Sequence, residues 1–189
     1  MTNDKILEVM ARYVDHLSRI GVDRSFWPRA AIDMWPCAAM PAADDDGTSQ
    51  HVRDVIGLLR DLYRAGGIAP AFFGHQGKTT DETAILGHCS QMLDKMEAFL
   101  DEGRVDKALR WLGFILGCAY AVNLRPTQKD YILLAGCRCV CDETRRLALA
   151  GDRTTAFLGL GFVQGCLFSL GHFSIGELAD HSRPAPGSE

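Results

Sequence analysis

The feature that most constrains the fold of this chain is a repeat in its second half. Residues 79–122 align without gaps with residues 127–170, at an offset of 48 residues. The identical positions are mainly glycine, cysteine and apolar residues, and the pairs are Thr79/Thr127, Leu86/Leu134, Cys89/Cys137, Asp94/Asp142, Gly103/Gly151, Ala108/Ala156, Leu112/Leu160, Gly113/Gly161, Phe114/Phe162, Gly117/Gly165 and Cys118/Cys166. The two copies are therefore expected to form the same local structure and to pack against each other.

Each copy has the pattern of a helical hairpin. In the first copy, apolar residues recur at helical spacing from Ile85 to Leu100, and Thr79 with Glu82 has the spacing of a capping box. The next segment, about residues 105–122, is apolar nearly all round after Arg110, so other helices must cover most of it. The sequence thus predicts an all-α fold, in which a duplicated helical hairpin forms a four-helix bundle with two additional N-terminal helices.

The two N-terminal helices are predicted at about residues 4–20 and 50–64, where apolar residues again fall on one face. Residues 22–47 contain three prolines and three consecutive aspartates, which indicates a long surface loop. A weaker repeat at an offset of 46 residues relates the two helices and pairs Asp15 with Asp61 and Gly21 with Gly67.

We therefore divide the chain into three regions within one compact unit. The N-terminal helical region is 1–78, with its loop at 22–47. The duplicated bundle is 79–184, with copies at 79–126 and 127–174, and 185–189 is a flexible tail.

Four glycines predict where the two apolar helices meet. Gly113 and Gly117 in one copy match Gly161 and Gly165 in the other, and four-residue spacing places each pair on one helix face. Because glycine costs about 1 kcal/mol against alanine inside a helix, a close helix crossing is the expected compensation. A small-molecule cleft between these helices is the alternative.

Charge and composition argue against several classes of protein. Lys plus Arg is 20 and Asp plus Glu is 24, giving a net charge of −4, and no basic stripe indicates a nucleic-acid partner. The start of the chain lacks the pattern of a signal peptide, and seven cysteines cannot all pair, so a reducing cytoplasm is expected. Residues 111–124 and 156–173 approach membrane length, but buried helices of a bundle explain them, so no membrane partner is predicted.

The residues that could carry chemistry give no pattern of an active site. Cys137, Cys139 and Cys141 resemble a metal cluster, but on a helix Cys139 points away from the other two. The six histidines are dispersed, and none has a serine, cysteine or carboxylate at a spacing that indicates a nucleophile and base pair. We predict no catalytic residue, no metal and no cofactor, and keep a metal protein or enzyme built from His88, Cys89 and this cysteine cluster as an alternative.

Loop aromatics are the candidate interaction residues. They lie in or beside the loops that follow the two N-terminal helices, and aromatic side chains in such places are typical anchors for protein partners. The residues are Phe26, Trp27, Trp35, Phe72 and Phe73. Closing the end of the bundle is the alternative role for the same side chains.

The segment Lys107-Ala-Leu-Arg-Trp-Leu-Gly-Phe-Ile-Leu-Gly, together with Leu160-Gly-Phe-Val-Gln-Gly and Ser174-Ile-Gly-Glu-Leu, resembles small accessory proteins of tailed bacteriophages. Those proteins share a helix of the form Arg-Trp-Leu-Gly-Phe-x-Gln-Gly. Here the pattern is split, since Arg110 and Trp111 lie in the first copy and Gln164 in the second. The resemblance implies a phage origin and therefore the cytoplasm of a bacterial host. Because small accessory proteins of phages often bind a host protein, it also implies such a partner.

Three hypotheses for function follow. The first is a non-enzymatic phage protein that binds and inhibits or modulates a host protein, such as a defence component, as anti-CRISPR proteins do. The second is a helical protein that binds or sequesters a small ligand, and the third is the Cys/His metal protein or enzyme. A homodimer is a further expectation, because the bundle has so much apolar helix.

Overall fold

The structure is a computed structural model that describes residues 1–22, 45–74, 77–124 and 130–183. Within these ranges the chain forms helices and no strands, which confirms the predicted all-α class. The helices are α1 (Asn3–Arg19), α3 (Asp45–Ala65), α4 (Glu82–Asp101), α5 (Val105–Leu124), α6 (Asp130–Leu149), α7 (Arg153–Ser169) and α8 (Ile175–His181).

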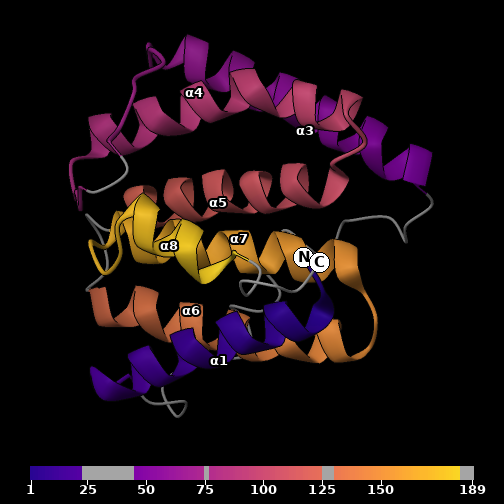
Figure 1. Cartoon of the computed structure of the whole chain (residues 1–189). Helices are drawn as coiled ribbons and strands as arrows, with labels where there is room; N and C mark the ends of the chain where they lie inside the picture. The colour runs from indigo at the N-terminus through magenta and orange to yellow at the C-terminus, as the bar shows by residue number, and fades with distance from the viewer. Residues whose placement is uncertain (23–44, 75–76, 125–129, 184–189) are drawn as a thin grey trace.

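The helices form a layered bundle with α5 and α7 at its centre (Figure 1). Helix α4 packs on α5 and α6 packs on α7, each as the antiparallel partner of a hairpin. On the outside, α3 covers α4 and α1 covers α6. Helix α1 therefore packs on the hairpin that is farthest from it in the sequence.

The two central helices run in the same direction and touch through backbone. A Cβ atom built on Gly113 would overlap the carbonyl oxygen of Leu158, and one built on Gly161 would overlap the carbonyl oxygen of Arg110. Gly117 and Gly165 meet the carbonyl oxygens of Phe162 and Phe114 in the same way. The backbones lie so close at all four glycines that no ligand fits between the helices at this crossing.

Side-chain contacts at the crossing are also reciprocal, since each central helix makes the same contact with the other. The Cys118 thiol lies 3.5 Å from the carbonyl oxygen of Gly165, and the Cys166 thiol lies 3.3 Å from the carbonyl oxygen of Gly117. Gly103 and Gly151 end α4 and α6 with φ angles of 68° and 83°, a conformation that glycine adopts without strain. Positions 48 residues apart thus occupy equivalent places in the two hairpins.

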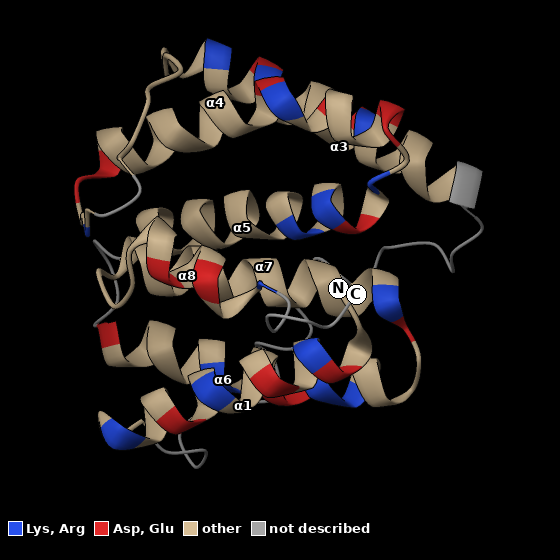
Figure 2. Cartoon of the chain, viewed as in Figure 1, with Lys and Arg blue, Asp and Glu red and all other residues tan. Residues whose placement is uncertain are grey.

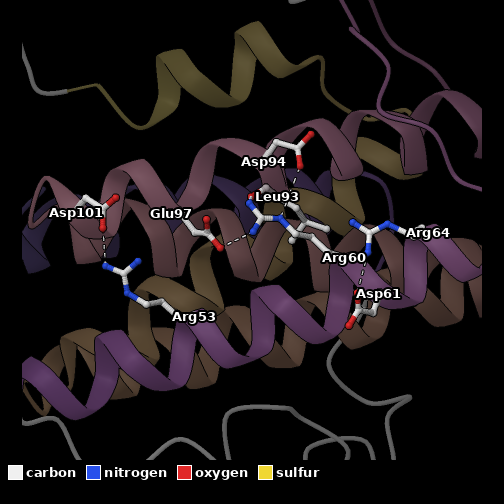
Figure 3. Close-up of polar contacts among 8 residues, drawn as sticks. All are labelled: Arg53, Arg60, Asp61, Arg64, Leu93, Asp94, Glu97 and Asp101. Carbon is white, nitrogen blue, oxygen red and sulfur yellow. Dashed lines mark hydrogen bonds and ion pairs between the residues drawn. The ribbon is translucent and has the colours of Figure 1, made fainter.

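Both outer helices bury an apolar face, and α3 is in addition joined to its neighbour by ion pairs. The face of α1 toward the bundle is buried completely and consists of Ile6, Val9, Met10, Tyr13 and Leu17. Helix α3 is linked to α4 by charged pairs, since Arg53 contacts Asp101 at 2.7 Å and Arg60 contacts Asp94, Glu97 and the Leu93 carbonyl oxygen (Figure 3).

Helix ends differ in detail from the sequence predictions. The N-cap of α4 is Asp81, whose carboxylate accepts a hydrogen bond from the Ala84 amide at 2.7 Å, whereas Thr79 accepts one from the Asp81 amide. The predicted capping box of Thr79 and Glu82 is therefore wrong. Helix α3 begins at Asp45, so the predicted loop at 22–47 ends sooner than expected, while residues 23–44 lie outside the described ranges.

Charged side chains lie along α1, α3, α4 and α6, whereas α7 is almost free of charge (Figure 2). Every residue of α7 from Ala156 to Ser169 is buried. Even so, no helix in the described part of the chain is both long and apolar enough to cross a membrane.

Candidate functional site

A pocket of about 300 Å³ opens beside α5. Its walls come from α4, α5 and α8, from Gln164 of α7, and from Phe72 and Phe73 in the segment after α3. Gly87 of α4 lets that segment approach, because its carbonyl oxygen accepts a hydrogen bond from the Ala71 amide at 2.9 Å, and a Cβ at Gly87 would lie 2.8 Å from the Ala71 side chain. The chain leaving α3 is thus brought against α4, at the edge of the pocket.

The charges that line the pocket are all positive. Lys107 and Arg110 project from one face of α5, three residues apart, and Lys95 comes from α4. No aspartate or glutamate is among the described residues that line it. The pocket therefore favours an anion.

Arg110 is a pocket cation without an anionic partner among the described residues. Its side chain is partly buried in the pocket wall, and it makes no hydrogen bond or ion pair with any residue in the described ranges. Burial lowers the pKa of its guanidinium, which nevertheless stays charged, because arginine does not deprotonate in proteins. Burial, and then the charges of Arg104 and Arg110, lowers the pKa of Lys107.

Aromatic rings make up much of the remaining wall. Trp111 packs edge-on against Phe99 at 4.8 Å between ring centroids, and the Lys107 ammonium lies 3.9 Å from the centroid of Phe99. Phe73 and Phe114 both pack against Phe168, at 5.6 and 5.5 Å. These contacts fix the rings, so the apolar wall is in place before any ligand arrives.

A buried polar network supports the far side of the pocket. The Gln164 amide nitrogen lies 3.0 Å from the Tyr13 hydroxyl and 3.0 Å from the Ser182 hydroxyl. Ser182 donates to the carbonyl oxygen of Leu178 at 3.1 Å, and Tyr13 lies 3.4 Å from His181. The network ties α7 to α1 and to α8, whose Leu178 and Ser182 also line the pocket.

Helix α8 is set in place by its own first turn. Ser174 caps it and forms a capping box with Glu177, with hydrogen bonds of 3.2 Å and 2.7 Å between side chain and backbone. These bonds to Ser174 lower the pKa of the Glu177 carboxyl.

The predicted interaction residues fall in different places. Phe26, Trp27 and Trp35 lie outside the described residues. Phe72 is 74% exposed and Phe73 is half-buried, and both line the pocket. The structure thus brings two of the five aromatics to the candidate site.

The cysteines of the alternative metal site are mostly in the core. Cys89, Cys137 and Cys141 are buried and Cys139 is partly buried. Within the described ranges, no three His, Cys, Asp or Glu side chains are grouped so that they could hold a metal ion. Burial raises the pKa of the Cys89 and Cys141 thiols.

The pocket cations were not predicted from the sequence. The available signal is that Lys107 and Arg110 are the last charged residues before the apolar part of their segment and lie on one face of it. Gln164 is likewise the lone amide in its apolar segment. Arg110, Trp111 and Gln164, which are separated between the two copies in the sequence, all line this one pocket.

Comparison with known proteins adds no assignment: no family model, curated protein or solved structure matches this chain.

Proposed function

We propose that this protein is a non-enzymatic binding protein whose pocket beside α5 holds a small organic anion. The observation that carries the proposal is Arg110, a partly buried cation with no hydrogen bond or ion pair to any described residue, in a wall without carboxylates. Leaving a cation in such a place is costly unless a negative group meets it.

The polar groups of the wall, which also include His88 and Gln91, can bind an anion. Lys95, Lys107 and Arg110 supply positive charge, and the Ser182 hydroxyl already accepts from Gln164 and donates to Leu178. The fixed aromatic rings supply apolar surface of the kind that small-molecule sites use.

The test compares probes that share a body and differ in charge. Calorimetric titration of the full chain with 1-naphthoate, 1-naphthyl phosphate and neutral 1-naphthol should show at least one anion binding about tenfold more tightly than the alcohol. Arg110→Met should remove that difference. Arg104→Met is the matched control, because Arg104 is exposed, pairs with Glu102 and does not line the pocket. Equal binding of the anions by wild type and Arg110→Met would contradict the proposal.

A second candidate function is binding to a host protein, such as a defence component, as the phage resemblance implies. It is favoured by exposed apolar side chains, since Leu58 and Leu62 on α3 are 61% and 58% exposed and Phe72 is 74% exposed. A tagged wild-type chain should capture one bacterial protein in near-stoichiometric amount. The folded variant Leu58→Glu/Leu62→Glu should lose that protein, and retention of it would exclude this surface.

We also infer that the two hairpins arose by duplication. The supports are the matched residues 48 positions apart and the reciprocal contacts of Gly113 and Gly161. The weaker repeat extends the inference to α1 and α3, which cover α6 and α4 in the same manner. A bacterial cytoplasm and a homodimeric state belong to the same proposal, the first because the cysteines in the described ranges are free thiols.

A further inference from the structure

We propose that the anion is a nucleoside monophosphate, with its phosphate at Arg110 and Lys107 and its base among the aromatic rings. This inference rests on the proposed function, because it names the chemical class of ligand for the same pocket. Three observations lead to it: the number of cations, the makeup of the wall and the size of the cavity.

The number of cations favours a phosphate over a carboxylate. Lys107 and Arg110 lie one helical turn apart on the same face of α5, and Lys95 faces the same cavity from α4. A carboxylate carries one negative charge, whereas a phosphate monoester carries nearly two at neutral pH and offers three acceptor oxygens. The phosphate can therefore meet the guanidinium fork of Arg110 through two oxygens and the Lys107 ammonium through the third.

The environment of Lys107 points the same way. Its ammonium is adjacent to the rings of Phe99 and Trp111, and Lys107 lies one helical turn from Arg110 on α5. Two like charges held together in a partly buried wall repel each other, and a doubly charged group between them relieves that repulsion.

The rest of the wall fits a flat, ring-bearing body with polar edges. Phe72, Phe73, Trp111 and Phe114 offer rings on which a base can stack, and stacking on aromatic side chains is a common way to hold a base. Gln91 adds an amide that can both donate and accept hydrogen bonds. A nucleobase carries donors and acceptors that can bond this amide, whereas a plain hydrocarbon carries none.

The size of the cavity limits how much of a ligand can lie inside it. Its volume of about 300 Å³ is at the lower end of the range for small-molecule sites. It suits one base, one sugar and one phosphate, and leaves no room for a second nucleotide inside the pocket.

The experiment is calorimetric titration of the full chain at about pH 7.5, where a phosphate monoester is a dianion. The probes are AMP, GMP, CMP, UMP, adenosine, inorganic phosphate and the pair 1-naphthyl phosphate and 1-naphthoate. We expect at least one nucleotide to bind about tenfold more tightly than both inorganic phosphate and adenosine, and 1-naphthyl phosphate to bind more tightly than 1-naphthoate.

Two variants assign the groups. Arg110→Met should weaken every anion about tenfold or more, whereas Lys107→Met should bring the naphthyl phosphate and naphthoate affinities to within about threefold of each other. Arg104→Met should bind all probes as the wild type does, since it lies outside the pocket.

The outcomes separate this inference from the proposed function. If 1-naphthoate binds as tightly as 1-naphthyl phosphate, the phosphate assignment is wrong and anion binding stands. If 1-naphthyl phosphate binds but no nucleotide exceeds inorganic phosphate, the nucleoside assignment is wrong. If no anion binds more tightly than its neutral counterpart, both proposals fall.

Discussion

The hairpins α4–α5 and α6–α7 occupy equivalent places around the central crossing, yet the first supplies eight of the residues that line the described pocket and the second only Gln164. Trp111 and Gly159 are equivalent positions, 48 residues apart. In α6–α7, the missing side chain of Gly159 lets Thr144 lie directly against α7, where a Cβ would overlap the Thr144 hydroxyl. In α4–α5, the Trp111 ring occupies this level, stacks edge-on against Phe99 and lines the cavity.

The hairpins also differ in charge, because the pocket cations are present in α4–α5 and absent from the equivalent positions of α6–α7. The positions equivalent to Lys95, Lys107 and Arg110 are Glu143, Thr155 and Leu158, and none of these is a cation. The two hairpins therefore share the glycines of the crossing, whereas the three cations of the pocket all belong to α4–α5.

The largest expected effect tests what the two hairpins share. Gly113→Ala and Gly161→Ala each place a Cβ into backbone of the opposite helix, so each should destabilise the fold by at least about 3 kcal/mol, and by similar amounts. Gly57→Ala on α3 is the control, because its Cβ would meet nothing within 4 Å, and it should stabilise by about 1 kcal/mol. Urea unfolding measures all three, and a mild effect at either crossing glycine would contradict the close contact.

The next effect tests what separates the hairpins. Gly159→Ala should destabilise by about 2 kcal/mol, since the new methyl group meets the buried Thr144 side chain. Adding Thr144→Ala should recover most of the loss, because it removes the hydroxyl that the new methyl group at position 159 would overlap, whereas Thr144→Ser keeps that hydroxyl and should recover little. Unfolding free energies of the single and double variants form a double-mutant cycle that reports the coupling.

Removing the uncompensated cation should stabilise the free protein. Arg110→Met replaces a partly buried charge by an apolar side chain of similar length, so we expect a gain of about 1 kcal/mol without ligand. The same change should abolish anion-induced thermal stabilisation. A loss of stability in Arg110→Met would mean that Arg110 has a structural role that its surroundings do not reveal.

A pH effect should appear on the side of α1, away from the pocket cations. His16 and His172 lie 3.1 Å apart between ring nitrogens, and burial, the largest cause, lowers the pKa of both. The folded state therefore binds fewer protons than the unfolded chain, so stability is complete above a pH of about 6.5 and falls as the pH drops below it. Urea midpoints between about pH 8 and pH 5 should show this fall, and His16→Asn should flatten it. An unchanged slope in that variant would place the effect at another histidine.

The smallest expected effect concerns the charged contact of α3 with α4. Arg60→Met should cost about 1 kcal/mol at low salt and less at high salt, because Arg60 bonds the Leu93 carbonyl oxygen and pairs with Asp94 and Glu97. Arg53→Met, which removes a more exposed pair, should cost less. Salt titration of the unfolding midpoint distinguishes these pairs from packing, which salt does not screen.

The sequence predicted helices and their crossing because those features repeat along the chain. The spacing of Gly113 with Gly117 and of Gly161 with Gly165 places each pair on one helix face, and a helix face without side chains is typical of close helix packing. The pocket was not predictable in this way, since its residues come from α4, α5, α7, α8 and the segment after α3. These residues meet because the tertiary packing places α8 against Gln164 of α7, beside α4 and α5.

The misplaced cap of α4 has a local cause. Thr79 and Asp81 are both good N-cap residues, and sequence spacing alone favoured the one that matched Glu82. In the folded chain Thr79 instead binds the amide of Asp81, which leaves Asp81 to cap the helix.

The place of α1 has a consequence for the order in which the chain can fold during synthesis. Its buried face docks on α6 and α7, with Asn3 bonding the carbonyl oxygen of Ala148 at 3.1 Å and Arg138 bonding Ser18 at 2.7 Å. A ribosome makes α1 before α6 and α7, so the apolar face of α1 waits without its binding surface while α3, α4 and α5 are made. The last step of folding is then the docking of α1 on α6 and α7. Because this contact joins distant parts of the chain, it forms slowly and limits the rate at which the bundle is completed.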